Sequence, residues 1–256
     1  MKSLIAFTKK EITEQIRSGK LLFLCILFCA LGVMNPAVAK LTPWFYEIFA
    51  DSLSQSGIVI TAVEVSALDS WLQFFKNIPM GIIAFVLIEG SIFTKEYSSG
   101  TLVLSLTKGL SRRNVLISKT LILVSMWTVM YWMCFGITYA YNAYFWDNSI
   151  AKNLLLSVVC CWVFGLLISL LIVMLSALTK TSTGVFLGVG LVVLACYIVS
   201  MIPKIGKYLP TFLMDGNSLI YGLKEAGEYI AALVISIAAI IVCFAASIPV
   251  FNKKQL

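Results

Sequence analysis

The chain has 256 residues, of which 60% are hydrophobic and only 12% are charged; its formal net charge is +7 and its mean hydropathy +0.97. Soluble domains are about 45–50% apolar and about 25% charged, so this composition excludes a soluble globule, whether cytosolic, secreted or nucleic-acid-binding. The absence of histidine excludes Ser-His catalysis, HExxH zinc sites and histidine proton relays.

Six apolar segments are long enough to cross a bilayer as helices, since a span needs roughly 20 apolar residues at about 1.5 Å each. They lie at about 21–38, 77–93, 118–145, 154–178, 183–202 and 229–251. Strands do not fit, because the apolar runs exceed strand length and a spanning backbone must satisfy its own hydrogen bonds. The sequence therefore predicts an all-α integral membrane protein in which residues 1–256 form a single transmembrane domain.

The distribution of basic residues predicts the orientation. With the N-terminus inside, the inner segments contain most of the 19 Lys and Arg residues, including Lys9, Arg17, Arg112 and Lys180. Lys and Arg concentrate in the cytoplasmic loops of membrane proteins. Both termini are therefore predicted to be cytoplasmic, and the net positive charge reports topology rather than nucleic-acid binding.

Residues 1–20 have the pattern of an amphipathic helix. Ile5, Ile12 and Ile16 share one stripe at helical spacing, while Lys10 and other charged residues lie opposite. Two interpretations are open and compatible: an anchor on the inner membrane surface that sets the angle of the first span, or a lever that touches a cytoplasmic partner.

After the first span, residues 36–76 are expected to form a long outer loop. Pro36 and Pro43 mark its beginning, and the apolar patch from Trp44 to Phe49 suggests an interfacial helix within it. In the second span, Glu89 is the only charged residue placed firmly inside a span. It is expected either to bond to a neighbouring helix or to form a gate or substrate contact near the cytoplasmic mouth.

The segment between spans 2 and 3 predicts a short amphipathic helix over 101–110. Ser98 or Ser99 can cap its start, and Gly109 with Ser111 can end it. One face carries the apolar residues Leu102, Val103, Leu106 and Leu110. Such a helix is either a simple interfacial loop or a docking element for a soluble partner. The flanking Glu96 and Arg112 can hold its ends to the spans or pair with that partner.

Span 3 carries aromatic and polar side chains on one face at helical spacing: Trp127, Tyr131, Phe135, Thr138, Tyr139 and Asn142. Helix packing explains such a face most simply, and the path of an amphiphilic cargo is the alternative.

The run KEYSSGTLVLSLTKGLSRRNVLISKTL resembles the signature of bacterial ABC-type exporter permeases of the six-helix class, which are similar in topology to type V exporters. The positions that carry the resemblance are Glu96, Gly100, Thr101, Ser111, Arg112 and Lys119. The resemblance implies a connecting helix at 1–20, a coupling helix at 98–110 and a helical outer segment at 203–228. It also implies that Glu96, Gly100, Thr101 and Arg112 belong to the ATPase-coupling region.

A permease of this class performs no chemistry itself, and the chain contains no GxxxxGK[ST] phosphate loop. The resemblance implies that ATP and Mg²⁺ are bound by a separate cytoplasmic ABC ATPase subunit. Six spans are half of the usual twelve, so a second permease copy or a paralogue is expected. The sequence thus predicts an exporter subunit of the bacterial plasma membrane for a peptide, drug or lipid-like substrate. An ion-coupled transporter or an intramembrane enzyme without an ATPase partner is the alternative.

Overall fold

The computed structural model describes residues 2–55, 64–107 and 109–254, and these form helices and turns with no strand. Six of the helices are long and apolar enough to span a membrane, which confirms the all-α, six-span prediction. The candidate spans are Lys20–Phe45, Ala67–Ser98, Arg112–Phe145, Leu154–Leu178, Ser182–Ser200 and Ala226–Lys253.

The first two spans are longer than the sequence predicts. Helix α2 (Lys20–Gln55) runs on through Pro36 and Pro43, so the expected loop after residue 38 is wrong. The patch at Trp44 belongs to α2 and is not a separate interfacial helix. Membrane helices tolerate proline because neighbouring groups satisfy the carbonyls that it frees. Residues 56–63 of the expected loop lie outside the described residues.

Helix α3 (Ala67–Glu89) begins before the predicted boundary at residue 77. The Asp69 carboxylate accepts a hydrogen bond from the Ser66 backbone N–H at 2.9 Å, which satisfies a donor at the helix start. Trp71 and Phe74 in this added stretch are fully buried, so apolar packing extends the helix beyond the uniformly apolar run.

Helix α7 (Leu154–Leu178) is the most buried of the six spans. It packs against α6 (Arg112–Phe145), α8 (Ser182–Ser200) and α11 (Ala226–Lys253), while α2 packs against α3 and α6. At the α6–α7 contact, a Cβ on Gly165 would overlap the indole of Trp127, so only glycine allows this approach. By contrast, α8 buries few of its side chains within the chain.

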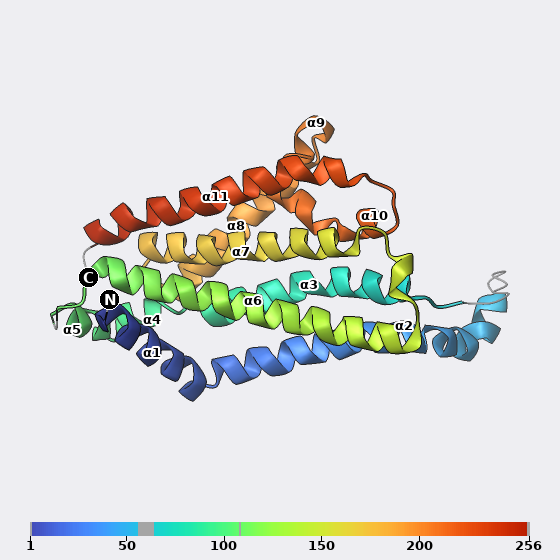
Figure 1. Cartoon of the computed structure of the whole chain (residues 1–256), viewed down its shortest axis with the longest axis horizontal. Coiled ribbons are helices and arrows are strands. Elements are labelled where there is room, and N and C mark those ends of the chain that lie inside the picture. The colour runs from blue at the N-terminus through green and yellow to red at the C-terminus, as the bar shows by residue number, and fades with distance from the viewer. Residues whose placement is uncertain (1, 56–63, 108, 255–256) are drawn as a thin grey trace.

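The shorter elements cap the two ends of the bundle (Figure 1). Helix α1 (Lys2–Arg17), α4 (Thr94–Ser98), α5 (Thr101–Thr107) and the last turn of α11 lie at one end, called here the α5 end. The 3-10 turn η1 (Asn148–Ile150) and α10 (Gly216–Ile220) lie at the other.

The predicted helical outer segment at 203–228 consists of α9 (Pro203–Gly206), the 3-10 turn η2 (Pro210–Met214) and α10. Leu213 and Leu219 are fully buried, and the Tyr229 hydroxyl of α11 donates to the Asp215 carbonyl at 2.7 Å. The segment therefore folds back onto α7 and α11 rather than extending as a loop.

Candidate functional site

The predicted coupling helix is shorter than expected and is bracketed by two glycines. Helix α5 ends at Thr107 rather than at residue 110, and Lys108 lies outside the described residues. Gly100 and Gly109 have φ values of +66° and +88°, a left-handed conformation that glycine adopts without strain. The Ser111 side chain caps α6, accepting from the Asn114 N–H at 3.2 Å.

The four apolar side chains assigned to the docking face do not form one exposed face. Leu102 is 1% exposed and belongs to the core of this chain, so its assignment to a docking face is wrong. Leu106 and Leu110 are half-buried against the same core, whereas Val103 is 42% exposed. Helical spacing identifies an apolar face, but a short helix that lies on its own bundle turns that face inward.

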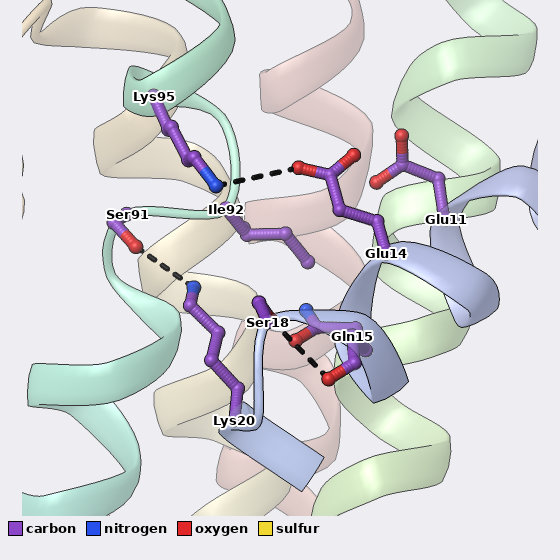
Figure 2. Close-up of a pocket in the computed structure, with 8 residues that line it drawn as sticks. All are labelled: Glu11, Glu14, Gln15, Ser18, Lys20, Ser91, Ile92 and Lys95. Atoms are coloured by element: carbon purple, nitrogen blue, oxygen red, sulfur yellow. Dashed lines mark hydrogen bonds and ion pairs between the residues drawn. The ribbon is translucent and has the colours of Figure 1, made fainter.

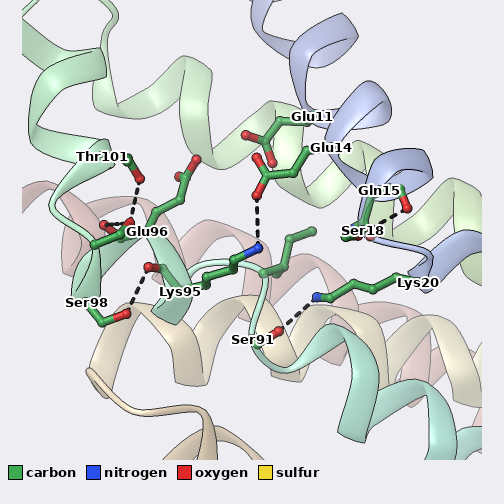
Figure 3. Close-up of polar contacts among 12 residues, drawn as sticks. Glu11, Glu14, Gln15, Ser18, Lys20, Ser91, Lys95, Glu96, Ser98 and Thr101 are labelled. Carbon is green, nitrogen blue, oxygen red and sulfur yellow. Dashed lines mark hydrogen bonds and ion pairs between the residues drawn. The ribbon is translucent and has the colours of Figure 1, made fainter.

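A cluster of buried charged side chains joins the three helices α1, α4 and α6. Lys119 of α6 is 1% exposed, and its Nζ lies 2.7 Å from Glu11 Oε2 of α1 and 3.1 Å from Glu96 Oε2 of α4. The same ammonium donates to the Ile92 carbonyl at 2.9 Å. Figure 3 shows Glu11 and Glu96 approaching each other from α1 and α4.

Lys10 completes this cluster from the solvent side. Its Nζ lies 2.8 Å from Glu96 Oε1, 3.1 Å from Glu11 Oε1 and 3.5 Å from Glu14 Oε2. Burial lowers the pKa of Lys10, but its hydrogen bond to Glu96 and the charges of Glu11 and Glu96 outweigh the effect of burial, so this pKa lies above its ordinary value. We call Lys10, Glu11, Glu96 and Lys119 the charge junction.

The three carboxylates of Glu11, Glu14 and Glu96 lie within 4.8 Å of one another, a spacing at which they could hold a metal ion. Lys10 already contacts all three, and Lys119 contacts Glu11 and Glu96. The positive charge that the carboxylates require is therefore supplied by the protein.

Glu89 lies beside the charge junction at the end of α3 and is fully buried. Its Oε2 accepts a hydrogen bond from Gln15 Nε2 of α1 at 2.8 Å, which confirms the expected bond to a neighbouring helix. Next to it, Lys20 donates to the Ser91 hydroxyl at 2.8 Å (Figure 2). The gate or substrate role of Glu89 stays a prediction.

Arg112 holds the start of α6 to the end of α11. Its guanidinium donates to the carbonyls of Phe251, Asn252 and Lys254 at 3.1, 3.1 and 2.6 Å. Glu96 and Arg112, which flank α5 in the sequence, therefore both bond within the chain.

The span 3 residues mostly pack between helices. The Trp127 indole donates to the Trp162 carbonyl at 3.0 Å, and the Tyr131 hydroxyl donates to the Val158 carbonyl at 2.7 Å, so both bind α6 to α7.

Farther along α6, the residues of this face differ in exposure. The Phe135 ring centroid lies 5.5 Å from that of Trp71. Tyr139 is 45% exposed, and the buried Asn142 amide has no hydrogen-bond partner among the described residues. The described contacts are those of helix packing, and a cargo path along this face stays a prediction.

A separate apolar cavity of about 400 Å³ opens between α3, α7 and α8. Its lining includes Ile82, Val86, Phe164, Phe186, Val189 and Tyr197. None of the residues predicted for a gate or a substrate path lines it. Sequence reasoning missed this cavity because all three helices read as uniformly apolar, and only the three-dimensional packing shows where they separate.

The sequence also gave no indication that Glu11 and Gln15 are buried. Both lie between the isoleucine stripe and the charged side of the helix, on a face that has no clear apolar pattern. Lys119 is recognisable as the partner of Glu11 only when α1 is placed on α6.

Comparison with known proteins is consistent with this architecture. The model of the ABC-2 family transporter protein matches residues 5–256, which is almost the whole chain. No protein of curated function matches it. Members of this family are membrane permease domains that associate with an ABC ATPase, generally as dimers. With six spanning helices and this match across its length, the chain belongs to the ABC-2 family of transporter membrane proteins.

Proposed function

We propose that the chain is the permease subunit of an ATP-driven exporter in the bacterial plasma membrane, and that it moves an amphiphilic peptide, drug or lipid-like molecule out of the cell. A separate ABC ATPase binds ATP and Mg²⁺ and docks at the α5 end. A second permease copy or a paralogue completes the translocation path. The family match supports the permease assignment, and the details of partner and substrate are part of the proposal.

The charge junction is the observation that supports coupling at the α5 end. Through Lys119 and Glu96 it ties α6 to α4, which is separated from α3 only by residues 90–93. Glu11 extends the tie to α1. Breaking a buried ion pair by removing one partner costs about 3–5 kcal/mol, so these elements are expected to move together rather than separately.

The proposed mechanism follows from this connection. When the ATPase dimer closes on ATP, it displaces α5, which is joined to α4 on one side and to α6 on the other. The displacement reaches α3 and α6 and changes the separation of the helices around the apolar cavity. Access to a path between two permeases then alternates between the two sides of the membrane.

The test uses Val103, the exposed member of the predicted docking face. Val103→Asp should leave the permease folded, because the side chain is 42% exposed, but should weaken association with the ATPase. Central contacts at interfaces are worth about 2 kcal/mol or more, so we expect a loss of roughly 30-fold in affinity. Association is measured by titrating the ATPase onto the purified permease, together with ATP turnover of the complex.

Leu223→Asp is the matched control, since Leu223 is 78% exposed in the turn between α10 and α11. It should leave association and turnover unchanged. The proposal fails if Val103→Asp associates as tightly as the unaltered chain, or if purified permease transports in response to an ion gradient without any ATPase.

A further inference from the structure

Helix α1 has three distinct stripes around its circumference. Phe7, Glu11 and Gln15 form the buried stripe that faces the bundle. Next to it lies a stripe of Ile5, Ile12 and Ile16, which are 62%, 47% and 58% exposed. At 100° per residue, Lys9 and Arg17 follow on the far side of the isoleucines. The apolar stripe therefore lies between the bundle and a basic stripe.

The contacts of α1 place it beside the ends of the spans. Thr8 donates to the Ser118 hydroxyl at 3.0 Å, Glu11 pairs with Lys119, and Gln15 bonds to Glu89. Ser118 and Lys119 lie in the second turn of α6, about 10 Å from its start. Since α6 has 34 residues and is roughly 51 Å long, its first turns extend beyond a hydrocarbon core of about 30 Å. A bilayer centred on the spans would place α1 at the depth of the lipid headgroups.

A groove of about 620 Å³ opens along the basic stripe. Its lining contains four basic side chains and one acidic one: Lys9, Lys10, Arg17, Lys95 and Glu14. Glu14 pairs with Lys10 and Lys95, at 3.5 and 3.7 Å. Within the part of the chain that the structure describes, no acidic side chain lies within ion-pairing distance of the exposed Lys9 or Arg17. Thr13 and Ser18 add hydroxyl groups to the lining.

We propose that this groove binds the phosphate headgroup of an anionic phospholipid, in the leaflet that meets the α5 end. The isoleucine stripe lies in the acyl region of that leaflet, and Lys9 and Arg17 bind the phosphate from the water side. An apolar stripe next to a basic stripe at headgroup depth is the arrangement with which interfacial helices bind anionic membranes. The lipid would hold α1 against α4 and α6, to which the charge junction joins it. The proposal does not depend on the ATPase or the transported substrate.

The experiment uses the full chain in nanodiscs that contain equal amounts of phosphatidylglycerol and phosphatidylcholine. Native mass spectrometry measures the ratio of the two lipids retained after release from the nanodisc. We expect the unaltered chain to retain phosphatidylglycerol preferentially, and the preference to fall as salt rises. Lys9→Gln with Arg17→Gln should weaken the preference by roughly fivefold per residue removed.

Two controls make the result specific. Lys204→Gln with Lys207→Gln removes the same charge from exposed residues of α9 and its C-cap, and should leave the preference unchanged. Lys9→Arg with Arg17→Lys retains the charge at the groove and should retain the preference.

The proposal is overturned if the unaltered chain shows no preference, if both double Gln variants lose it equally, or if the groove variant keeps it. Loss of ATPase association in the groove variant with an unchanged lipid preference would assign the groove to the partner protein instead.

Discussion

Individual buried charges hold the α5 end together. Glu11 and Glu96 are nearly inaccessible, and Lys119 lies between them, ion-paired with both carboxylates and hydrogen-bonded to Glu11 and to a backbone carbonyl. The cost of removing charges from water is offset only when each of them keeps several partners. Because the chain provides these partners from three elements, removing Glu11, Glu96 or Lys119 leaves a buried charge with fewer partners than it needs.

Lys119→Met tests this dependence. The change removes the buried cation between Glu11 and Glu96 and leaves only the half-exposed Lys10 to pair with them, so it should lower the free energy of unfolding by about 3–5 kcal/mol. Thermal unfolding of the purified chain in one detergent measures the effect. Adding Glu11→Gln should recover part of the loss, because one uncompensated charge is removed.

Lys180→Met serves as the comparison, since Lys180 is exposed in the turn between α7 and α8. It should change stability by no more than about 0.5 kcal/mol. Equal unfolding midpoints for the Lys119 and Lys180 variants would show that the charge junction contributes nothing to stability.

The surroundings of Lys254, at the same end of the molecule, predict that the reactivity of its amine depends on pH. Burial, followed by the nearby charge of Lys180, lowers the pKa of Lys254 to about 8 from an ordinary 10.5. Its amine donates to the carbonyls of Ser176 and Thr179 and lies 4.1 Å from the Tyr97 ring centroid. Since only the neutral amine reacts with acylating reagents, labelling of Lys254 should rise with pH and reach its midpoint near 8. A midpoint near 10.5, as for an exposed lysine, would contradict this assignment.

Among the elements, α5 shows what a sequence pattern can and cannot determine. Its start directly after Gly100 was predictable, because a turn glycine acts locally. Ser111 was expected only to end this helix, and it caps α6, while the Ser98 and Ser99 hydroxyls, expected to cap the start of α5, donate to carbonyls of α4. The orientation of α5 was not predictable. An apolar face is the same pattern whether it is buried by the chain itself or by a partner, and Leu102 is buried by the chain.

The two prolines of α2 are a second case in which a local sequence signal led to a wrong prediction. Proline is a strong signal for a helix end in water, and Pro36 and Pro43 led to a predicted loop. In a spanning helix the backbone has no water to bond with, so the helix continues through both residues to Gln55.

The contact between α6 and α7 predicts the effect of glycine replacement. Gly165→Ala places a methyl group where the Trp127 ring lies, and should destabilise the chain by about 1–3 kcal/mol through overpacking. Gly136→Ala is the matched change, since Gly136 lies in α6 with open space around the new methyl group. It should be neutral or slightly stabilising. The packing account fails if the two variants unfold at the same temperature.

At the scale of the whole molecule, composition was enough to predict a membrane protein, and the lengths of the apolar runs were enough to predict the number of spans. Each span satisfies its own backbone, so an apolar run of sufficient length is enough to identify it. The placement of α1 was not predictable, because it depends on Glu11, Gln15 and Thr8 meeting partners more than 70 residues away. The exposed faces of α8 and α11 leave surface for lipid or for a second permease.

Orientation gives a prediction for the molecule as a whole. In a variant without its native cysteines, a cysteine at position 223 should react with a membrane-impermeant maleimide added outside intact cells. A cysteine at position 103 should react only after the cells are opened, because most Lys and Arg residues of the inner segments lie at the α5 end. Labelling of position 103 in intact cells would reverse the orientation.

The most direct measurement of the central claim is photo-crosslinking in native membranes, from a photoreactive residue at position 103 of the permease to its ABC ATPase. We predict a crosslink from position 103 that changes in yield when ATP is added, and none from position 223. If the ATPase assembles with the permease but no crosslink forms from position 103, then α5 is not the docking element, and the coupling path through the charge junction is wrong.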